Sequence, residues 1–90
     1  MNFPDALKEC LNGKRITNLN WNGRGMYCFM MPGYVNGVPA NATLAQAAGI
    51  KEGETVKILP YLMMRNAKDE FVPWVISNMD VFSDRWAVIE

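Results

Sequence analysis

Three short segments carry residues whose types and spacing suit binding of a phosphate, a flat ring or a ribose. The first is the heptapeptide WNGRGMY, in which Trp21 precedes a turn that contains Gly23 and Gly25. Glycine allows a positive φ and lets backbone amides approach a ligand closely, so such a loop can hold a phosphate. The spacing matches neither a P-loop nor a dinucleotide fingerprint, and the same glycines also fit a plain hairpin turn.

The second and third segments adjoin each other near the C-terminus. Trp74 follows a proline in an apolar stretch, where its indole is either a core anchor or a flat surface on which a base stacks. Ser77 and Asp80 then supply a hydroxyl and a carboxylate, which suit ribose hydroxyls and base edges and equally suit the capping of a short helix. Asp84 and Trp86 follow in the same segment.

These residue types predict binding without catalysis. The sequence contains no His, the side chain whose pKa best suits proton transfer near neutral pH. Its acidic pairs fall in polar turns and its two cysteines in apolar segments, so no nucleophile lies beside a recognisable base. Two cysteines without a histidine also do not complete a zinc site. We therefore predict a protein that is not an enzyme and has no metal site and no cofactor.

Length and composition describe one small globular domain. The chain has 90 residues, half of them apolar and a fifth charged, and a chain of this length does not normally divide. Nine basic and nine acidic side chains give a formal net charge of zero, so no strong field attracts nucleic acid or acidic membrane. There is no signal-like leader, and no window approaches the roughly 20 apolar residues of a membrane span. We expect a soluble, cytoplasmic protein.

The N-terminal third predicts a helix followed by a hairpin. Apolar residues recur at helical spacing over residues 3–11, with Asn2 as N-cap and Gly13 as the stop. Cys10 falls on this apolar stripe and Cys28 in an apolar strand, which predicts two buried reduced thiols, with a disulfide as the alternative. The predicted strands of the hairpin are residues 16–21 and 26–31.

The rest of the chain is divided by glycine, proline and asparagine. Residues 32–42 contain two of each, which predicts an irregular loop or a short extended excursion, and a capping-box order at residues 43–46 predicts a two-turn helix that ends at Gly49. Further strands are predicted over residues 55–65, 71–77 and 85–90, with Pro60 at a bulge or edge position and a polar turn over 66–70. The prediction is α+β: an N-terminal helix packed on a mainly antiparallel sheet of four or five strands, with residues 1–90 as a single domain.

The apolar content predicts association between copies of the chain. Three Trp, three Tyr, four Phe and seven Met in 90 residues give a short-stranded open sheet more apolar surface than one helix can cover. A chain of this size buries only roughly two-thirds of its unfolded surface. We therefore expect a homo-oligomer that completes its core between subunits.

Taken together, the segments resemble a family of small, mostly phage-encoded proteins, the second class of Thoeris anti-defence proteins. The resemblance runs from end to end and is carried by the N-terminal MNFPDALKECLNGKRI, by WNGRGMY and by PWVISNMDVFSDRW. The sequence departs from the family pattern at Pro4, in the first helical turn, and at Arg85, where an acidic residue often precedes the final Trp. Residues 34–48 match little of it.

The resemblance implies a protein that does no chemistry on its ligand. Family members bind a cyclic ADP-ribose isomer made by a TIR-domain enzyme on infection, hold it unmodified, and so deprive the Thoeris effector of its signal. Some relatives also take up cyclic oligonucleotide signals. The resemblance further implies a homo-oligomer, expected to be a tetramer, with pockets between subunits, acting in the cytoplasm of the infected bacterium.

Nine residues are predicted to contact this ligand. Trp21 and Trp74 are expected to supply aromatic faces, each stack contributing on the order of 1 to 3 kcal/mol. Asn22, the amides of Gly23 and Gly25, and the charge of Arg24 are assigned to the phosphates or ribose. The other predicted hydrogen-bonding groups are those of Tyr27, Ser77 and Asp80.

Two further functions stay open at the level of sequence. The same aromatic residues could stack successive bases of single-stranded nucleic acid, although the basic residues form no continuous track. The tryptophans could instead only fill an oligomer interface, in a protein with a purely structural role. A ligand-induced rise in melting temperature separates the structural role from the binding role.

Overall fold

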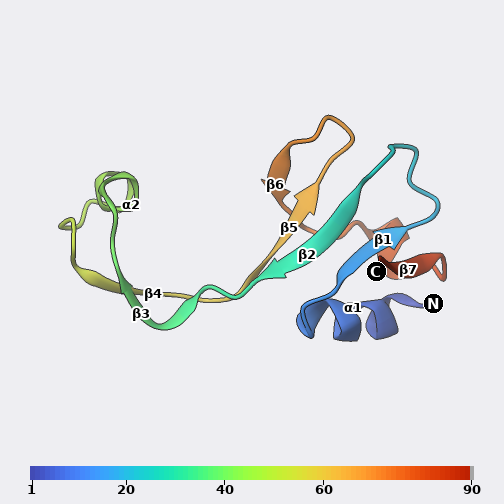
Figure 1. Ribbon diagram of the computed structural model, residues 1–90, viewed down its shortest axis with the longest axis horizontal. Helices are drawn as coiled ribbons and strands as arrows, with labels where there is room; N and C mark the ends of the chain where they lie inside the picture. Colours follow the sequence, from blue (N-terminus) through green and yellow to red (C-terminus); the bar gives the residue numbers. More distant parts are fainter. Residues whose placement is uncertain (90) are drawn as a thin grey trace.

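The computed structural model describes residues 1–89 and contains a five-stranded antiparallel sheet, a smaller two-stranded sheet and three helices (Figure 1). The strand order of the larger sheet is β6-β5-β2-β1-β7, and the smaller sheet pairs β3 with β4. In chain order the elements are α1 (Phe3–Leu11), β1 (Arg15–Asn18), β2 (Tyr27–Met31), β3 (Tyr34–Pro39), α2 (Ala42–Ala48), β4 (Thr55–Ile58), β5 (Tyr61–Arg65), β6 (Phe71–Pro73), α3 (Asn78–Val81) and β7 (Trp86–Ile89).

The N-terminal helix forms as its sequence predicts. The side chain of Asn2 accepts a hydrogen bond from the backbone N–H of Asp5 at 2.9 Å, and Asp5 lies in the first turn, where the helix dipole favours a negative charge. Helix α1 packs against β1, β2 and β7. Its fully buried residues Ala6 and Cys10 meet the sheet, so the predicted helix-on-sheet architecture is confirmed.

The core lies between α1 and one face of the sheet. Ile16 and Cys28 are opposite each other on β1 and β2, and both are fully buried with Trp86 of β7. Both cysteines are buried and free, which confirms the predicted reduced thiols. The N-terminus is bonded to β7 beside this core, because the ammonium of Met1 donates to the carbonyl of Trp86 at 2.8 Å.

The opposite face of the sheet carries a second set of large apolar side chains. Side chains alternate between faces along a strand, so the residues next to the covered ones in each strand point away from α1. We call the resulting surface the open face; its large residues are Tyr27, Phe29, Met31, Tyr61, Met63 and Phe71.

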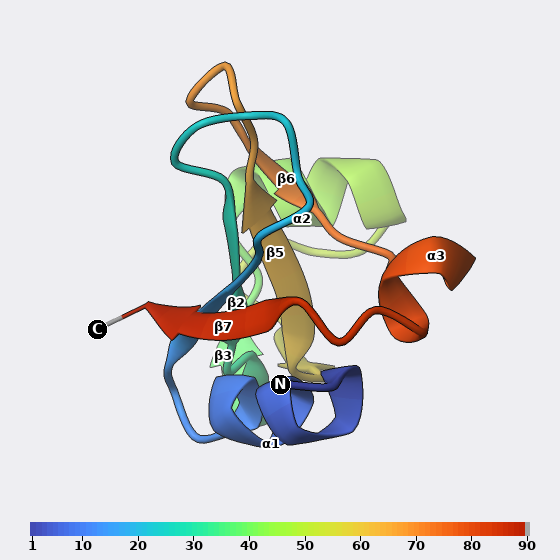
Figure 2. The same cartoon turned by 90° about the vertical axis from the view of Figure 1, so that its right-hand side faces the viewer.

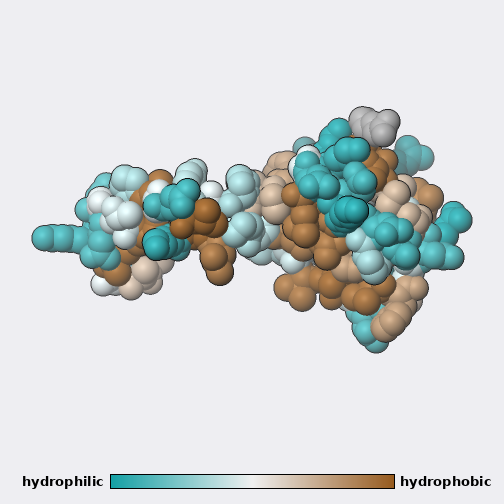
Figure 3. Space-filling model, turned by 90° about the horizontal axis from the view of Figure 1, so that it is seen from below, coloured by the Kyte–Doolittle hydropathy of each residue, from teal (hydrophilic) through white to brown (hydrophobic). Residues whose placement is uncertain are grey.

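Residues 32–60, here called the arm, form a lobe that projects from the sheet. Strands β2 and β5 run out of the sheet through this segment into β3 and β4, with α2 at the far tip (Figure 1). Figure 3 shows the arm as a separate lobe joined to the body by a narrow neck. Viewed along the long axis in Figure 2, α1, β7 and α3 lie in front and α2 lies behind, so the arm and the C-terminal elements are at opposite ends.

The arm is where the observed structure departs most from the predicted elements. Residues 32–42 take the extended alternative, because residues 34–39 form strand β3 and pair with β4, with Gly33 at positive φ before the strand and Gly37 at positive φ within its register shift. The predicted strand over 55–65 is two strands that belong to different sheets. The Leu59–Pro60 break separates them, since proline has no N–H to continue a ladder.

Three smaller boundaries also differ from the prediction. The strand predicted over 16–21 ends at Asn18, the one over 71–77 ends at Pro73, and helix α2 is capped by Asn41 and not by Thr43. The Asn41 side chain accepts from the N–H of Leu44 at 2.8 Å, as a good N-cap does. The final strand ends at Ile89, and residue 90 of the predicted strand lies outside the described residues. No helix within residues 1–89 is long and apolar enough to cross a membrane.

Candidate functional site

Four aromatic rings meet at the end of the sheet that is farthest from the arm. We call them the tryptophan cluster: Phe3, Trp21, Trp74 and Trp86. The centroids of Trp21 and Trp74 are 6.5 Å apart, and those of Trp21 and Trp86 are 5.4 Å apart, both pairs nearly perpendicular. Such edge-to-face pairs are favoured beyond their burial. Trp86 is buried, whereas Trp21 and Trp74 are half-buried at the edge of the core.

Asp80 ties the cluster together. Its two carboxylate oxygens each accept from the indole N–H of Trp21 at 3.2 Å, and its backbone carbonyl accepts from the indole N–H of Trp86 at 2.8 Å. Its own N–H donates to the hydroxyl of Ser77 at 3.1 Å, which is the N-cap of α3. The four-residue helix α3 therefore positions Asp80 to bond two tryptophans, Trp21 through its carboxylate and Trp86 through its backbone carbonyl.

The segment between β1 and β2 is shaped by Asn18. Its side-chain oxygen accepts from the N–H of Asn20 at 2.9 Å, and its backbone carbonyl accepts from the N–H of Trp21 at 3.1 Å. This turn directs Trp21 toward β7 and α3. The side-chain amide nitrogen of Asn18 is buried and has no hydrogen-bond partner among the described residues. This turn therefore contains one unsatisfied N–H donor group.

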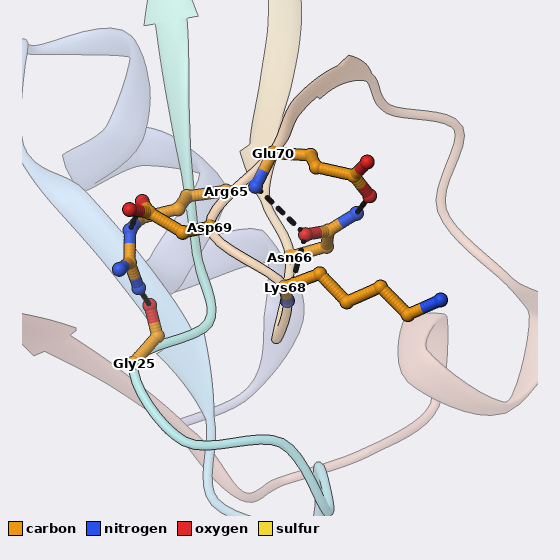
Figure 4. Close-up of polar contacts among 6 residues, drawn as sticks. All are labelled: Gly25, Arg65, Asn66, Lys68, Asp69 and Glu70. Atoms are coloured by element: carbon orange, nitrogen blue, oxygen red, sulfur yellow. Dashed lines mark hydrogen bonds and ion pairs between the residues drawn. The ribbon is translucent and has the colours of Figure 1, made fainter.

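Arg65 holds the loop of residues 22–25, here called the glycine loop, at Gly25. One guanidinium nitrogen of Arg65 donates to the carbonyl of Gly25 at 2.8 Å, and Nε donates to Asp69 at 2.8 Å (Figure 4). Asn66 closes the adjacent turn, since its side-chain oxygen accepts from the N–H groups of Lys68 and Glu70. Gly25 has φ +70°, so the predicted need for glycine holds there.

The predicted site residues thus divide between two places. Trp21, Trp74, Ser77 and Asp80 come together at the tryptophan cluster. Tyr27 lies on the open face, where the guanidinium groups of Arg15 and Arg65 are 5.2 and 5.9 Å from its ring centroid. The remaining predicted residues lie on the loop that joins the two places, with Asn22, Arg24 and Gly25 exposed and Gly23 half-buried.

Sequence reasoning missed several residues that shape these places. Trp86 belongs to the third sequence segment but is not among the predicted ligand contacts, although its indole N–H donates to the backbone carbonyl of Asp80. Phe3 was assigned only to a helix stripe, yet its ring lies 5.3 Å from that of Trp86. Arg65 lies 40 residues from Gly25, and no local sequence signal links them.

The tryptophan cluster offers flat apolar rings and one anionic acceptor. Ring edges and a carboxylate suit a planar heterocycle with N–H or hydroxyl donors. Burial raises the pKa of the Cys10 and Cys28 thiols, most strongly at Cys28, where the nearby charges of Cys10 and Asp80 add to the effect. Both thiols therefore stay protonated and weakly nucleophilic at neutral pH. Within residues 1–89, no three His, Cys, Asp or Glu side chains lie together as metal ligands would.

A cavity of about 130 Å³ lies elsewhere, where the arm leaves the sheet. None of the predicted site residues line it. Its lining is mostly apolar and comes from the ends of β2 and β4 and the starts of β3 and β5. The lining residues are Met31, Pro32, Gly33, Tyr34, Ile58 and Tyr61.

Fold and site together define a small helix-on-sheet protein with an aromatic and carboxylate cluster at the edge of its core. Comparison with known proteins gives the family. Residues 1–89 match the model of the Tad2-like family, described as a Thoeris anti-defense 2-like domain, and the chain belongs to this family. It is 24% identical over 92 residues to Thoeris anti-defense 2 of Bacillus phage SP01, covering 99% of this chain and 94% of that protein. The resemblance seen in the sequence motifs is thereby confirmed, and the protein is a member of an anti-Thoeris defence family.

Proposed function

We propose that the protein binds a cyclic ADP-ribose isomer made by a TIR-domain enzyme, holds it without cleaving it, and so blocks Thoeris defence in the cytoplasm of the infected bacterium. Family membership over the whole chain supports an anti-Thoeris role. The observation that carries the choice of ligand class is the pairing of half-buried Trp21 and Trp74 with the carboxylate of Asp80. This combination suits an adenine ring and its ribose.

Each group at the cluster has an assigned role in this proposal. The exposed parts of Trp21 and Trp74 stack on the adenine or its surroundings, while Asp80 and Ser77 accept from ribose hydroxyls or the base. The phosphates lie toward the loop, against the amides of Gly23 and Gly25 and the side chains of Asn22 and Arg24. Tyr27 is the remaining predicted hydrogen-bonding group, and it lies on the open face, beside Arg15 and Arg65.

Ligand sequestration needs affinity and no chemistry. The sequence has no histidine, and both thiols are buried, so the groups beside Asp80 are suited to holding a ligand and not to cleaving it. To outcompete the effector, a protein of this kind needs a nanomolar dissociation constant, about 12 kcal/mol of binding free energy. A few converging donors in a partly dry pocket can supply this to a dianion even at zero net charge.

The proposal includes assembly of several copies, with a tetramer as the expected size and ligand pockets at subunit boundaries. Three apolar side chains around α3 support it, because Val75, Met79 and Phe82 are 91%, 86% and 82% exposed. Large exposed apolar groups beside a ligand cluster are typical of a surface that another protein covers. In this arrangement a neighbouring subunit forms part of the pocket wall.

The test of the ligand assignment compares two alanine variants with a matched control. Trp21→Ala and Trp74→Ala each remove one proposed stack, which predicts an affinity lower by roughly 5- to 150-fold for a loss of about 1 to 3 kcal/mol. Leu11→Ala removes an exposed apolar side chain at the end of α1, outside the cluster and the α3 surface, and should weaken binding less. Calorimetric titration with a cyclic ADP-ribose isomer measures all three, and equal affinities would contradict the assignment.

One observation favours a second candidate function. Tyr27, Phe29 and Phe71 lie in a row on the open face, with ring centroids 6.0 and 5.9 Å apart and two arginines beside Tyr27. Aromatic rows flanked by cations bind single-stranded nucleic acid or cyclic oligonucleotides. A salt-dependent gel shift with short oligonucleotides tests this alternative, and its absence at low salt would exclude it.

A further inference from the structure

The open face is mostly apolar, unlike the solvent-facing side of an ordinary antiparallel sheet. An antiparallel sheet with one covered face normally presents polar residues on the other. Here large apolar side chains occupy most outward positions of β2, β5 and β6, with Arg65 of β5 as the charged exception. They are Tyr27, Phe29, Met31, Tyr61, Met63 and Phe71. Phe71 is 55% exposed and Tyr61 is 43% exposed. A contiguous apolar surface of this kind marks an interaction site.

The arm buries almost none of its own side chains and so has little core to stabilise it. Its buried residues are two alanines, Ala40 and Ala45. A two-stranded ribbon is marginally stable in water, and units below about 40 residues need a metal, a disulfide or a partner. Tyr34, Val35 and Leu59 leave at least half of their surface exposed on the arm, so the arm offers the apolar area that a supporting surface would cover.

From these two features we propose that the arm of one copy covers the open face of a second copy, and that the exchange is reciprocal. The arm and the C-terminal elements lie at opposite ends of the chain (Figures 1 and 2). Two copies placed side by side in opposite directions therefore bring each arm over the partner's sheet. A two-fold axis generates both contacts at once, which is the usual symmetry of a homodimer. Apolar side chains are visible on both lobes in Figure 3.

The surface area of the chain fits this arrangement. The accessible surface is 6505 Å², whereas a compact monomer of 10.2 kDa exposes about 5300 Å². The excess is about 1200 Å² for each copy, and a standard stable interface needs about 800 Å² from each partner. The radius of gyration is likewise 15.6 Å, compared with about 12 Å for a compact domain of this length. The excess surface of each copy is therefore large enough for one standard interface with an identical partner.

A second copy fits the open face better than nucleic acid does. Of the two arginines beside Tyr27, Arg65 is already bonded to Asp69 and to the carbonyl of Gly25. Arg15 is then the single cation left at that ring. An apolar arm needs no cations, and nucleic acid needs several.

The inference rests on the proposed assembly of several copies. Its test is the mass of the oligomer in solution, measured without ligand. Phe71→Glu places a charge on the open face, and Leu11→Glu places the same charge at the exposed end of α1, away from the open face, the arm and α3. Light scattering after gel filtration at micromolar concentration should give at least a twofold lower mass for Phe71→Glu than for Leu11→Glu. Circular dichroism verifies that both variants are folded. Equal masses in two folded variants would overturn the inference.

A cross-link identifies which surfaces meet. Val35→Cys on the arm and Phe71→Cys on the sheet are prepared separately, mixed, and treated with a short bismaleimide; Cys10 and Cys28 are buried and do not compete. Arm exchange predicts a covalent dimer in the mixture and much less in either variant alone. A dimer formed by Phe71→Cys alone would mean that sheets meet face to face and would refute arm exchange.

Two further results keep this inference separate from the proposed function. A monomeric wild-type chain would overturn both the assembly and the arm exchange, while its titration with a cyclic ADP-ribose isomer would still decide sequestration. Absence of the cross-link in the mixture, together with oligonucleotide binding that Phe71→Glu abolishes, would assign the open face to nucleic acid and refute the arm as its occupant.

Discussion

The carboxylate of Asp80 provides the sharpest test of how the cluster is built. In Asp80→Ala the backbone bonds to Trp86 and Ser77 can persist, because they use the main chain of residue 80. The variant therefore removes only the acceptor of the Trp21 indole N–H, now bonded at 3.2 Å to each oxygen. Hydrogen bonds to a charged group contribute about 1.5 to 3 kcal/mol when buried, so a half-buried one predicts a loss of about 1 to 2 kcal/mol.

Urea denaturation followed by tryptophan fluorescence measures this loss. Asp84→Ala is the matched control, since Asp84 is an exposed carboxylate four residues further on, and its free energy of unfolding should stay within about 0.5 kcal/mol of the wild type. The melting temperature of Asp80→Ala should fall by roughly 4 to 8 °C for each kcal/mol. Equal unfolding free energies for the two variants would refute the view that Asp80 fixes Trp21.

Three other predictions concern the core, the thiols and the arm. Trp86→Phe keeps a ring in the core but leaves the Asp80 carbonyl without its donor, and should lower the unfolding free energy by about 1 to 3 kcal/mol in the same denaturation assay. The raised pKa of the Cys28 thiol stabilises the fold fully below the unfolded value of 9.0; this stability is lost as pH rises above 9, and Cys28→Ala should flatten that decline in urea titrations between pH 8 and 11. Gly33→Ala puts a Cβ against the Ile58 carbonyl at φ +65°, so limited proteolysis within the arm should accelerate, and an unchanged cleavage rate would contradict the account.

The sequence predicted the elements that local signals define. Asn2 at the start of α1 and Ser77 at the start of α3 are caps whose hydrogen bonds are made within three residues. Gly49 likewise ends α2 in a left-handed conformation. Helix boundaries of this kind depend on nearby atoms, and local sequence contains them.

The arm and the division of the site could not be predicted in the same way. Residues 34–39 pair with residues 55–58 across an intervening helix, so their strand character depends on a distant partner. Which face of β2 holds Tyr27 depends on the pairing of Ile16 with Cys28, and a shift of one residue would reverse it. The two ends of the WNGRGMY motif, Trp21 and Tyr27, lie in different surroundings.

The measurement that tests the central proposal most directly is a calorimetric titration of the purified protein with a cyclic ADP-ribose isomer. The complex is then heated to unfold the protein, and the released ligand is identified by mass spectrometry. The account predicts nanomolar binding and recovery of the ligand unchanged. A millimolar dissociation constant, or recovery of a cleaved product, would contradict sequestration.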